Sequence, residues 1–349
     1  MIPKTEVKKL VNLFLLMIGT VVGVGFVTGA EIYSFFARFS ANSIFGLVCF
    51  FVLFFALTYK ILIKNKKDEN TLKMQNFDKI FSKNTNLRII CLKKFLVFFN
   101  VLMIASAMFS GLKFVIFQLF FSNQILIFLF CVFFVFLCLF FGIKWLAKVN
   151  GVLILFLIFV VLSMVFGMKN CSHFATENCC NNFGDSINLS FKNITLSLLF
   201  AGIYVFMNIV EIEPVIGEFK INFSKKQAVL FAGLYSFVLV LLLGIFCLFL
   251  NKFQFLTNQS MPLLSFFESL GKGKVLVFSM GLVLCLLTTL ISCLIGIKKS
   301  FIDKKLTNLS ASFLAAILAM IVGMVPFSVF VNVIYPIIGI VNFVIYVFL

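Results

Sequence analysis

The sequence predicts an all-α integral membrane protein with about ten transmembrane helices. Of its 349 residues, 62% are hydrophobic and only 12% are charged, whereas a soluble globular chain is roughly half apolar and about a quarter charged. The apolar residues form runs of roughly 18 or more, each long enough to cross a hydrocarbon core about 30 Å thick. Helices and closed barrels are the structures that pair all backbone groups within lipid. Runs such as 125–141 and 229–250 lack the polar–apolar alternation of barrel strands, so we predict a helical bundle.

We expect one polytopic membrane domain over residues 1–349. Its spans are expected at 10–37, 42–63, 95–121, 124–142, 150–168, 193–216, 228–250, 275–297, 309–327 and 329–349. If the N-terminus is cytoplasmic, 22 of the 29 Lys and Arg residues fall in inside segments and 7 in outside segments. This asymmetry favours the span count and places both termini in the cytoplasm.

The composition also bears on location and on partners. Lysine outnumbers arginine, and Phe, Asn and Ile are abundant, which suggests an A+T-rich bacterial genome and hence the bacterial inner membrane. The first apolar run has no small-residue cleavage site, so we expect no signal peptide. The net charge of +17 would suggest nucleic acid in a soluble protein, but the basic residues lie between the spans and are explained by orientation in the lipid bilayer. No nucleotide-binding loop, nucleophile–base pair or cofactor motif is recognisable, so we expect no enzyme, no nucleic-acid partner and no cofactor other than a bound ion.

Two polar loops between spans carry features of their own. The loop at 169–192 contains Cys171, Cys179, Cys180 and the only histidine, His173. A disulfide between two of the thiols is favoured over a metal site, because the histidine has no acidic or second histidine partner nearby.

The second loop, 251–274, predicts a short helix at the outer face, too short to span. Ser260 is its expected cap, Pro262 suits its first turn, and Gly271 suits its end.

The first span is unusual because it is rich in glycine. Gly19, Gly23, Gly25 and Gly29 lie within eleven residues and are followed by Glu31. Each glycine costs a helix about 1 kcal/mol relative to alanine, so the span is predicted to unwind there. Unwound backbone at membrane depth is tolerated where it lines a cavity, and its free groups can then bind an ion or solute. The alternative is close helix packing through the small residues at four-residue spacing, and both interpretations stay open.

The sixth span concentrates polar and helix-breaking residues, which are Gly202, Tyr204, Asn208, Glu211, Glu213 and Pro214. Carboxylates within a span are costly and usually face a pathway or a partner. The two glutamates do not share a helical face, so at most one is expected to point at a central cavity. Pro214 can kink or end the span, which would leave Glu213 at the cytoplasmic surface and Glu211 as the candidate for the cavity.

Four further residues have two interpretations each. The hydroxyls of Thr288 and Thr289, midway through the eighth span, either bond back to a carbonyl one turn earlier or supply oxygen ligands to a monovalent cation. Glu31 and Arg38 are seven residues apart and share a helical face, so they form either an outer gate or a local ion pair.

The positions of the two unusual spans match. Spans one and six are corresponding members of two five-span halves, at about 10–168 and 193–349. Interrupted helices at matching places in two halves indicate a binding site between inverted repeats.

At these residues the chain resembles a known family. The run Gly19-Thr20-Val21-Val22-Gly23-Val24-Gly25-Phe26, followed by Gly29-x-Glu31-Ile32, resembles the first span of the YkvI-like membrane proteins, a branch of the amino acid–polyamine–organocation superfamily. Tyr204-x-x-x-Asn208, Thr288-Thr289 and Tyr335-Pro336-x-x-Gly339 support the resemblance, which covers nearly the whole chain. It implies a LeuT-type fold of two inverted five-helix repeats, with interrupted helices one and six and alternating access around them.

The resemblance also implies site residues. A sodium ion would be held by the carbonyls of Gly19 and Val22 and the hydroxyls of Thr288 and Thr289. The solute would contact the first span at Gly23, Val24, Gly25 and Phe26, and the sixth at Ala201, Gly202, Tyr204 and Asn208. Apart from the resemblance, the residues themselves suggest gating or coupling at Glu31, Arg38 and Glu211. Thr20 and Phe26 stand where some relatives carry sodium-binding asparagines, so a second sodium is not expected.

The predicted function is a cation-coupled symporter, sodium-driven, for an amino acid or similar small zwitterionic solute. One rival is a sensor that keeps the transporter fold and binds solute without moving it, and the other is a channel or structural membrane subunit. Loss of the cation oxygens would mark a sensor, and Thr288 and Thr289 are present.

Overall fold

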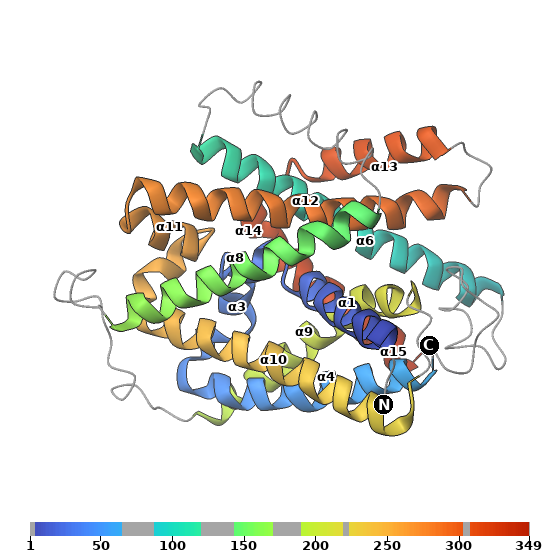
Figure 1. The fold of residues 1–349 in the computed structure, drawn as a ribbon, viewed down its shortest axis with the longest axis horizontal. Helices are drawn as coiled ribbons and strands as arrows, with labels where there is room; N and C mark the ends of the chain where they lie inside the picture. The colour runs from blue at the N-terminus through green and yellow to red at the C-terminus, as the bar shows by residue number, and fades with distance from the viewer. Residues whose placement is uncertain are drawn as a thin grey trace.

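A computed structural model describes residues 4–64, 87–119, 143–169, 190–218, 223–302 and 308–348. These residues form helices and connecting turns, with no strand among them (Figure 1). The longer helices are α1 (Lys4–Val21), α4 (Ser43–Lys64), α6 (Leu87–Leu119), α8 (Ile143–Lys169), α9 (Phe191–Glu218), α10 (Lys225–Lys252), α12 (Lys272–Ile302), α13 (Asn308–Val322) and α15 (Tyr335–Phe348). Shorter helices are α2 (Val24–Val27), α3 (Ala30–Phe35), α11 (Pro262–Ser269) and α14 (Phe327–Val329).

The predicted spans are largely confirmed. Seven helices in the described part of the chain are long and apolar enough to cross a membrane. They correspond to the second, third, fifth, sixth, seventh, eighth and tenth predicted spans. The ninth is the 15-residue helix α13, the first is broken into shorter pieces, and the fourth, at 124–142, lies outside the described residues.

The helices form two packed groups with α1 between them (Figure 1). One group pairs α12 with α6, α8 and α13, and the other pairs α4 with α9 and α10, and α9 with α15. Helix α1 contacts both groups, through α8 on one side and α9 on the other. The break in the first span therefore lies in the middle of the bundle.

The first span is interrupted, as predicted. α1 ends at Val21, α2 begins at Val24, and α3 begins after Gly29, whose φ of 78° is a left-handed conformation that side chains disfavour. Two carbonyls around the break find partners elsewhere: the carbonyl of Met17 accepts the hydroxyl of Tyr235 at 2.9 Å, and that of Thr28 accepts the N–H of Leu263 at 3.0 Å.

The sixth span corrects two predictions. α9 is one continuous helix that runs through Pro214 to Glu218, so helix six is not interrupted. The proline lies in the last turns, where it removes one backbone bond, and contacts with α4 and α15 hold the helix together. Because the helix continues, Glu213 is not at the surface: it is 7% exposed and accepts the hydroxyl of Tyr346 at 2.7 Å.

The predicted short helix in the second loop is α11. Pro262 is in its first turn, and Gly271 follows its end with a φ of 110°. The prediction of Ser260 as cap is wrong, because Met261 holds that position and no side chain caps the helix. α11 is largely buried and lies against the first span, since Leu263 bonds Thr28 and would also collide with a Cβ on Gly29.

Candidate functional site

A small cavity lies beside the break in the first span. Its volume is about 20 Å³, room for roughly one water molecule. The first span contributes Thr20, Val21, Gly23 and Glu31 to its lining, and α9 contributes Met207, Asn208 and Glu211. The remaining lining residues come from other helices and are Ile104, Met108, Thr289 and Tyr335. Four helices thus meet the broken span at one point.

Three glycines lie at the break and differ in the space around them. No atom lies within 4 Å of a Cβ placed on Gly23, whereas a Cβ on Gly25 would overlap the carboxylate of Glu31. The left-handed turn at Gly29 directs the chain so that α3 returns the side chain of Glu31 over Gly25. A glycine at position 25 is therefore required for Glu31 to face the cavity.

Glu31 is held by a tyrosine of the sixth span. It is 5% exposed, and the hydroxyl of Tyr204 donates to its Oε2 at 3.2 Å. The ring of Tyr204 packs against Phe35, Phe36 and Phe50, at centroid distances of 5.0, 5.4 and 5.9 Å. These contacts fix the donor, so the orientation of Glu31 is determined by packing.

Glu211 faces the same cavity from α9. It is of intermediate exposure, and it lies close enough to Glu31 for the two carboxylates to interact electrostatically. No lysine, arginine or histidine is among the described residues that line the cavity. Two acidic groups thus share a buried space with no basic side chain beside them.

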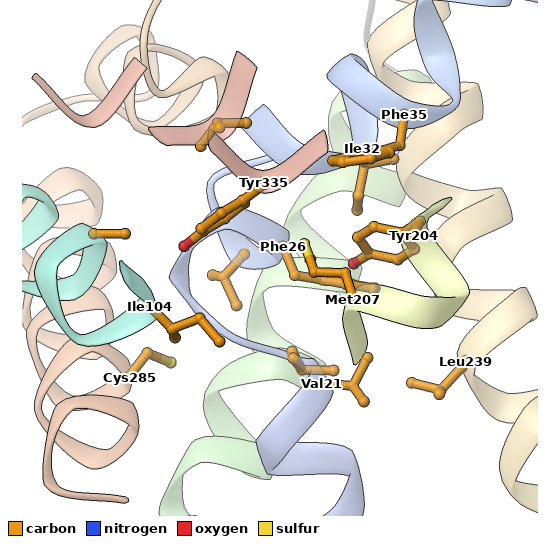
Figure 2. Close-up of a cluster of buried hydrophobic side chains, with 14 of the residues drawn as sticks. Val21, Phe26, Ile32, Phe35, Ile104, Tyr204, Met207, Leu239, Cys285 and Tyr335 are labelled. Atoms are coloured by element: carbon orange, nitrogen blue, oxygen red, sulfur yellow. The ribbon is translucent and has the colours of Figure 1, made fainter. Parts of the chain in front are cut away.

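Two neutral polar groups complete the lining. Asn208 is 2% exposed, its amide nitrogen donates to the carbonyl of Tyr204 at 2.8 Å, and its side chain also bonds the side chain of Tyr204. Tyr335 is also 2% exposed, and its hydroxyl has no hydrogen-bond partner in the described ranges. Figure 2 shows Tyr204 and Tyr335 on opposite sides of the broken first span.

The residues predicted to bind solute separate into two groups. Gly23 and Asn208 line the cavity, Gly25 lies under Glu31, and Tyr204 positions Glu31. Phe26, Ala201 and Gly202 do not line the cavity, and Phe26 packs on Phe246 at 5.2 Å. The side chain of Val24 lies outside those described.

The predicted sodium ligands are only partly brought together. Thr289 lines the cavity, whereas Gly19, Val22 and Thr288 do not. The hydroxyls of Thr288 and Thr289 both donate to the carbonyl of Cys285, at 2.9 and 3.1 Å, as the back-bonding interpretation expects. The Thr289 oxygen faces the cavity and can still accept a hydrogen bond or coordinate a cation there.

The predicted pair of Glu31 and Arg38 does not form. No ion pair joins them in the described structure; Arg38 is exposed and its guanidinium lies over the ring of Phe200, 3.9 Å from the centroid. The chain turns after Phe35 into a 3₁₀ segment, Ala37–Asn42, so the helical spacing behind the prediction does not hold. The loop with Cys171, His173, Cys179 and Cys180 lies outside the described residues, and its disulfide remains a prediction.

Sequence reasoning missed several lining residues. Ile104, Met108 and Met207 are ordinary apolar residues within apolar helices, and nothing in the sequence distinguishes them. The sequence indicates Tyr335 only as part of the family resemblance. A tyrosine beside a proline in an otherwise apolar span is nevertheless a detectable signal.

No family model and no curated protein matches the sequence. Among solved structures, the fold is similar to that of Mhp1, a nucleobase-cation-symport-1 family transporter, in a closed conformation with bromovinylhydantoin bound. The TM-score is 0.52 at 15% identity, over 92% of this chain and 73% of that one. The likeness is one of fold. It confirms the predicted all-α integral membrane class of LeuT type, while membership of the YkvI-like group and the boundaries of the two repeats remain predictions.

Proposed function

We propose that this chain is a cation-coupled symporter, driven by sodium, that carries an amino acid or a similar small zwitterion across the bacterial inner membrane. The observation that carries the proposal is the break in the first span. It exposes backbone to a polar cavity in the middle of the bundle, opposite Asn208 and Glu211 of the sixth span. Interrupted helices around a central site are the recurrent binding architecture of secondary transporters.

A zwitterion suits the groups around the break. Backbone N–H groups of an unwound segment can bind a carboxylate, and Glu31, Glu211 and Asn208 can bind an ammonium group. In the present conformation the carboxylate of Glu31 lies over Gly25, so a solute carboxylate reaches that backbone only after Glu31 turns away. A cavity of about 20 Å³ must also widen before it can hold an amino acid, as alternating access requires.

Uptake into proteoliposomes tests this function. The purified chain is reconstituted, and uptake of a labelled mixture of amino acids is followed under an inward sodium gradient and, separately, under a proton gradient. Saturable uptake that depends on sodium supports the proposal. Uptake driven by protons alone would overturn sodium coupling but not transport, and binding without uptake would support a sensor.

A pair of glycine variants locates the pathway. Gly25→Leu fills the space of Glu31 beside the break and should abolish uptake. Gly244→Leu in α10 is the matched control, because no atom lies within 4 Å of a Cβ at that position, and it should transport normally. Normal uptake by Gly25→Leu would place the pathway elsewhere.

A further inference from the structure

The two carboxylates of the central cavity need either protons or a cation to offset their negative charge. Glu31 and Glu211 line one buried space, and moving even one unpaired carboxylate out of water is costly. Two such groups close together cannot both remain ionised without a cation beside them. Either they hold protons, or a cation lies between them.

The remaining groups of the cavity are suited to a cation. The oxygen of Asn208 and the hydroxyl of Tyr335 belong to side chains that are only 2% exposed. The Tyr335 hydroxyl makes no hydrogen bond within the described part of the chain, and both residues line the cavity. Buried polar atoms are normally paired. Together with the hydroxyls of Thr20 and Thr289, the Asn208 oxygen and the Tyr335 hydroxyl line the cavity with oxygen ligands. Hard cations prefer such ligands.

The surrounding charges do not supply the missing partner. Tyr204 faces Glu31 from α9 and donates to it, and Tyr235 of α10 and Cys293 of α12 lie within electrostatic range of Glu211. α6 contributes Ile104 and Met108, which carry no charge. These titratable groups are neutral or negative, so none of them can neutralise a carboxylate.

We propose that Glu31 and Glu211, with Asn208 and Tyr335, bind one small cation, and that protons compete with the cation for the two carboxylates. When the cation binds, the O–H bond of a protonated carboxyl breaks, its proton leaves to solvent, and the cation takes its place. The cavity has room for roughly one water molecule, which fits a bare sodium ion or the ammonium head of a solute. This inference rests on the proposed function, for which it supplies the coupling step, but binding is measured without transport.

The test uses the purified full-length chain in detergent. Its thermal unfolding temperature is measured at increasing concentrations of sodium, potassium or methylammonium chloride, between about pH 5.5 and about pH 8.5. N-methylglucamine chloride keeps the ionic strength constant. We expect a small cation to stabilise the protein, with a half-saturating concentration that falls by up to about tenfold per pH unit where one proton is displaced. Stabilisation by sodium alone identifies an inorganic ion, and stabilisation by methylammonium identifies an ammonium head; either supports the site.

Glutamine variants assign the effect to the carboxylates. Glu31→Gln and Glu211→Gln should each raise the half-saturating concentration at least about tenfold, a loss of roughly 1.4 kcal/mol. Glu213→Gln is the matched control, because that buried carboxylate lies two residues from Glu211 but bonds Tyr346. It should behave as the parent chain. Should a glutamine variant not fold, Tyr335→Phe decides instead, with an expected rise of about two- to tenfold.

The proton count gives an independent measurement. Addition of the stabilising cation to weakly buffered protein should release protons, and the release should disappear in Glu31→Gln or Glu211→Gln but not in Glu213→Gln. The proposal is overturned if no cation stabilises the chain more than N-methylglucamine does, or if the half-saturating cation concentration does not change with pH. It is also overturned if Glu213→Gln loses cation stabilisation and proton release as fully as Glu31→Gln and Glu211→Gln do. Cation binding without uptake would overturn the proposed function and leave this site standing.

Discussion

The contact between Gly25 and Glu31 predicts a specific energetic coupling between them. In Gly25→Ala, the new Cβ would overlap the Glu31 carboxylate, so that side chain must turn away from Tyr204, whose hydroxyl now donates to it at 3.2 Å. Loss of a hydrogen bond to a charged group costs about 1.5–3 kcal/mol, and to a neutral group about 1 kcal/mol. We therefore expect Gly25→Ala to destabilise the parent chain by about 1–3 kcal/mol.

The same substitution should be harmless when Glu31 is already removed. In a Glu31→Ala background no carboxylate obstructs the new methyl group, and alanine in a helix is favoured over glycine by about 0.5–1 kcal/mol. The double-mutant cycle of Gly25→Ala and Glu31→Ala should thus give a coupling energy of about 1.5–4 kcal/mol, which overlaps the range for residues in contact. Equilibrium unfolding in mixed detergent micelles measures each corner. Equal effects of Gly25→Ala in the two backgrounds would refute the placement of Glu31 over the break.

Three further substitutions test the packing around the site. Gly339→Ala should destabilise by about 1–3 kcal/mol, because its Cβ would lie 2.5 Å from the backbone oxygen of Ile203, which cannot move without α9; unaltered unfolding would contradict this close approach of α15 and α9. Tyr204→Phe keeps the packed ring and removes the donor to Glu31, so it should cost about 1–3 kcal/mol in the same unfolding assay, and no cost would mean that the bond is absent. Thr289→Ala removes one oxygen from the cavity lining, so the sodium dependence of uptake should weaken. Because the hydroxyl bonds only within α12, unfolding should change by less than about 1 kcal/mol; unchanged sodium dependence would exclude Thr289 as a ligand.

The helices could be predicted from sequence because each depends on a local property. Hydrophobic runs of spanning length determine where helices cross, and the glycines at 23, 25 and 29 determine where the first of them breaks. The same local logic failed at Pro214, since a proline near a helix end removes only one backbone bond and packing of α9 against its neighbours outweighs that loss. It failed again for Glu31 and Arg38. Their spacing places them on one face only of a continuous helix, and α3 ends at Phe35, before Arg38.

The cavity could be predicted only in part, because its residues meet through tertiary packing. Glu31, Asn208 and Glu211 were recognisable as costly polar residues inside apolar spans. The overlap of Glu31 with Gly25 depends on the left-handed turn at Gly29, which sequence spacing does not reveal. Tyr335 reaches the cavity from α15, more than a hundred residues from Glu211, and no periodicity in one helix predicts such a meeting.

The polar groups near the break differ in whether they have hydrogen-bond partners. On the side of the packed helices, the carbonyls of Met17 and Thr28 have partners in Tyr235 and Leu263, so the broken helix loses little there. On the side of the cavity, the carboxylate of Glu211 lacks any hydrogen-bond partner among the described residues. A bundle selected for stability alone would replace such a group by an apolar one, since a half-satisfied buried network is worse than an apolar core. Retention of a costly, unpaired carboxylate at the point where the backbone is open is explained when a ligand supplies the missing charge, as the proposed cation site requires.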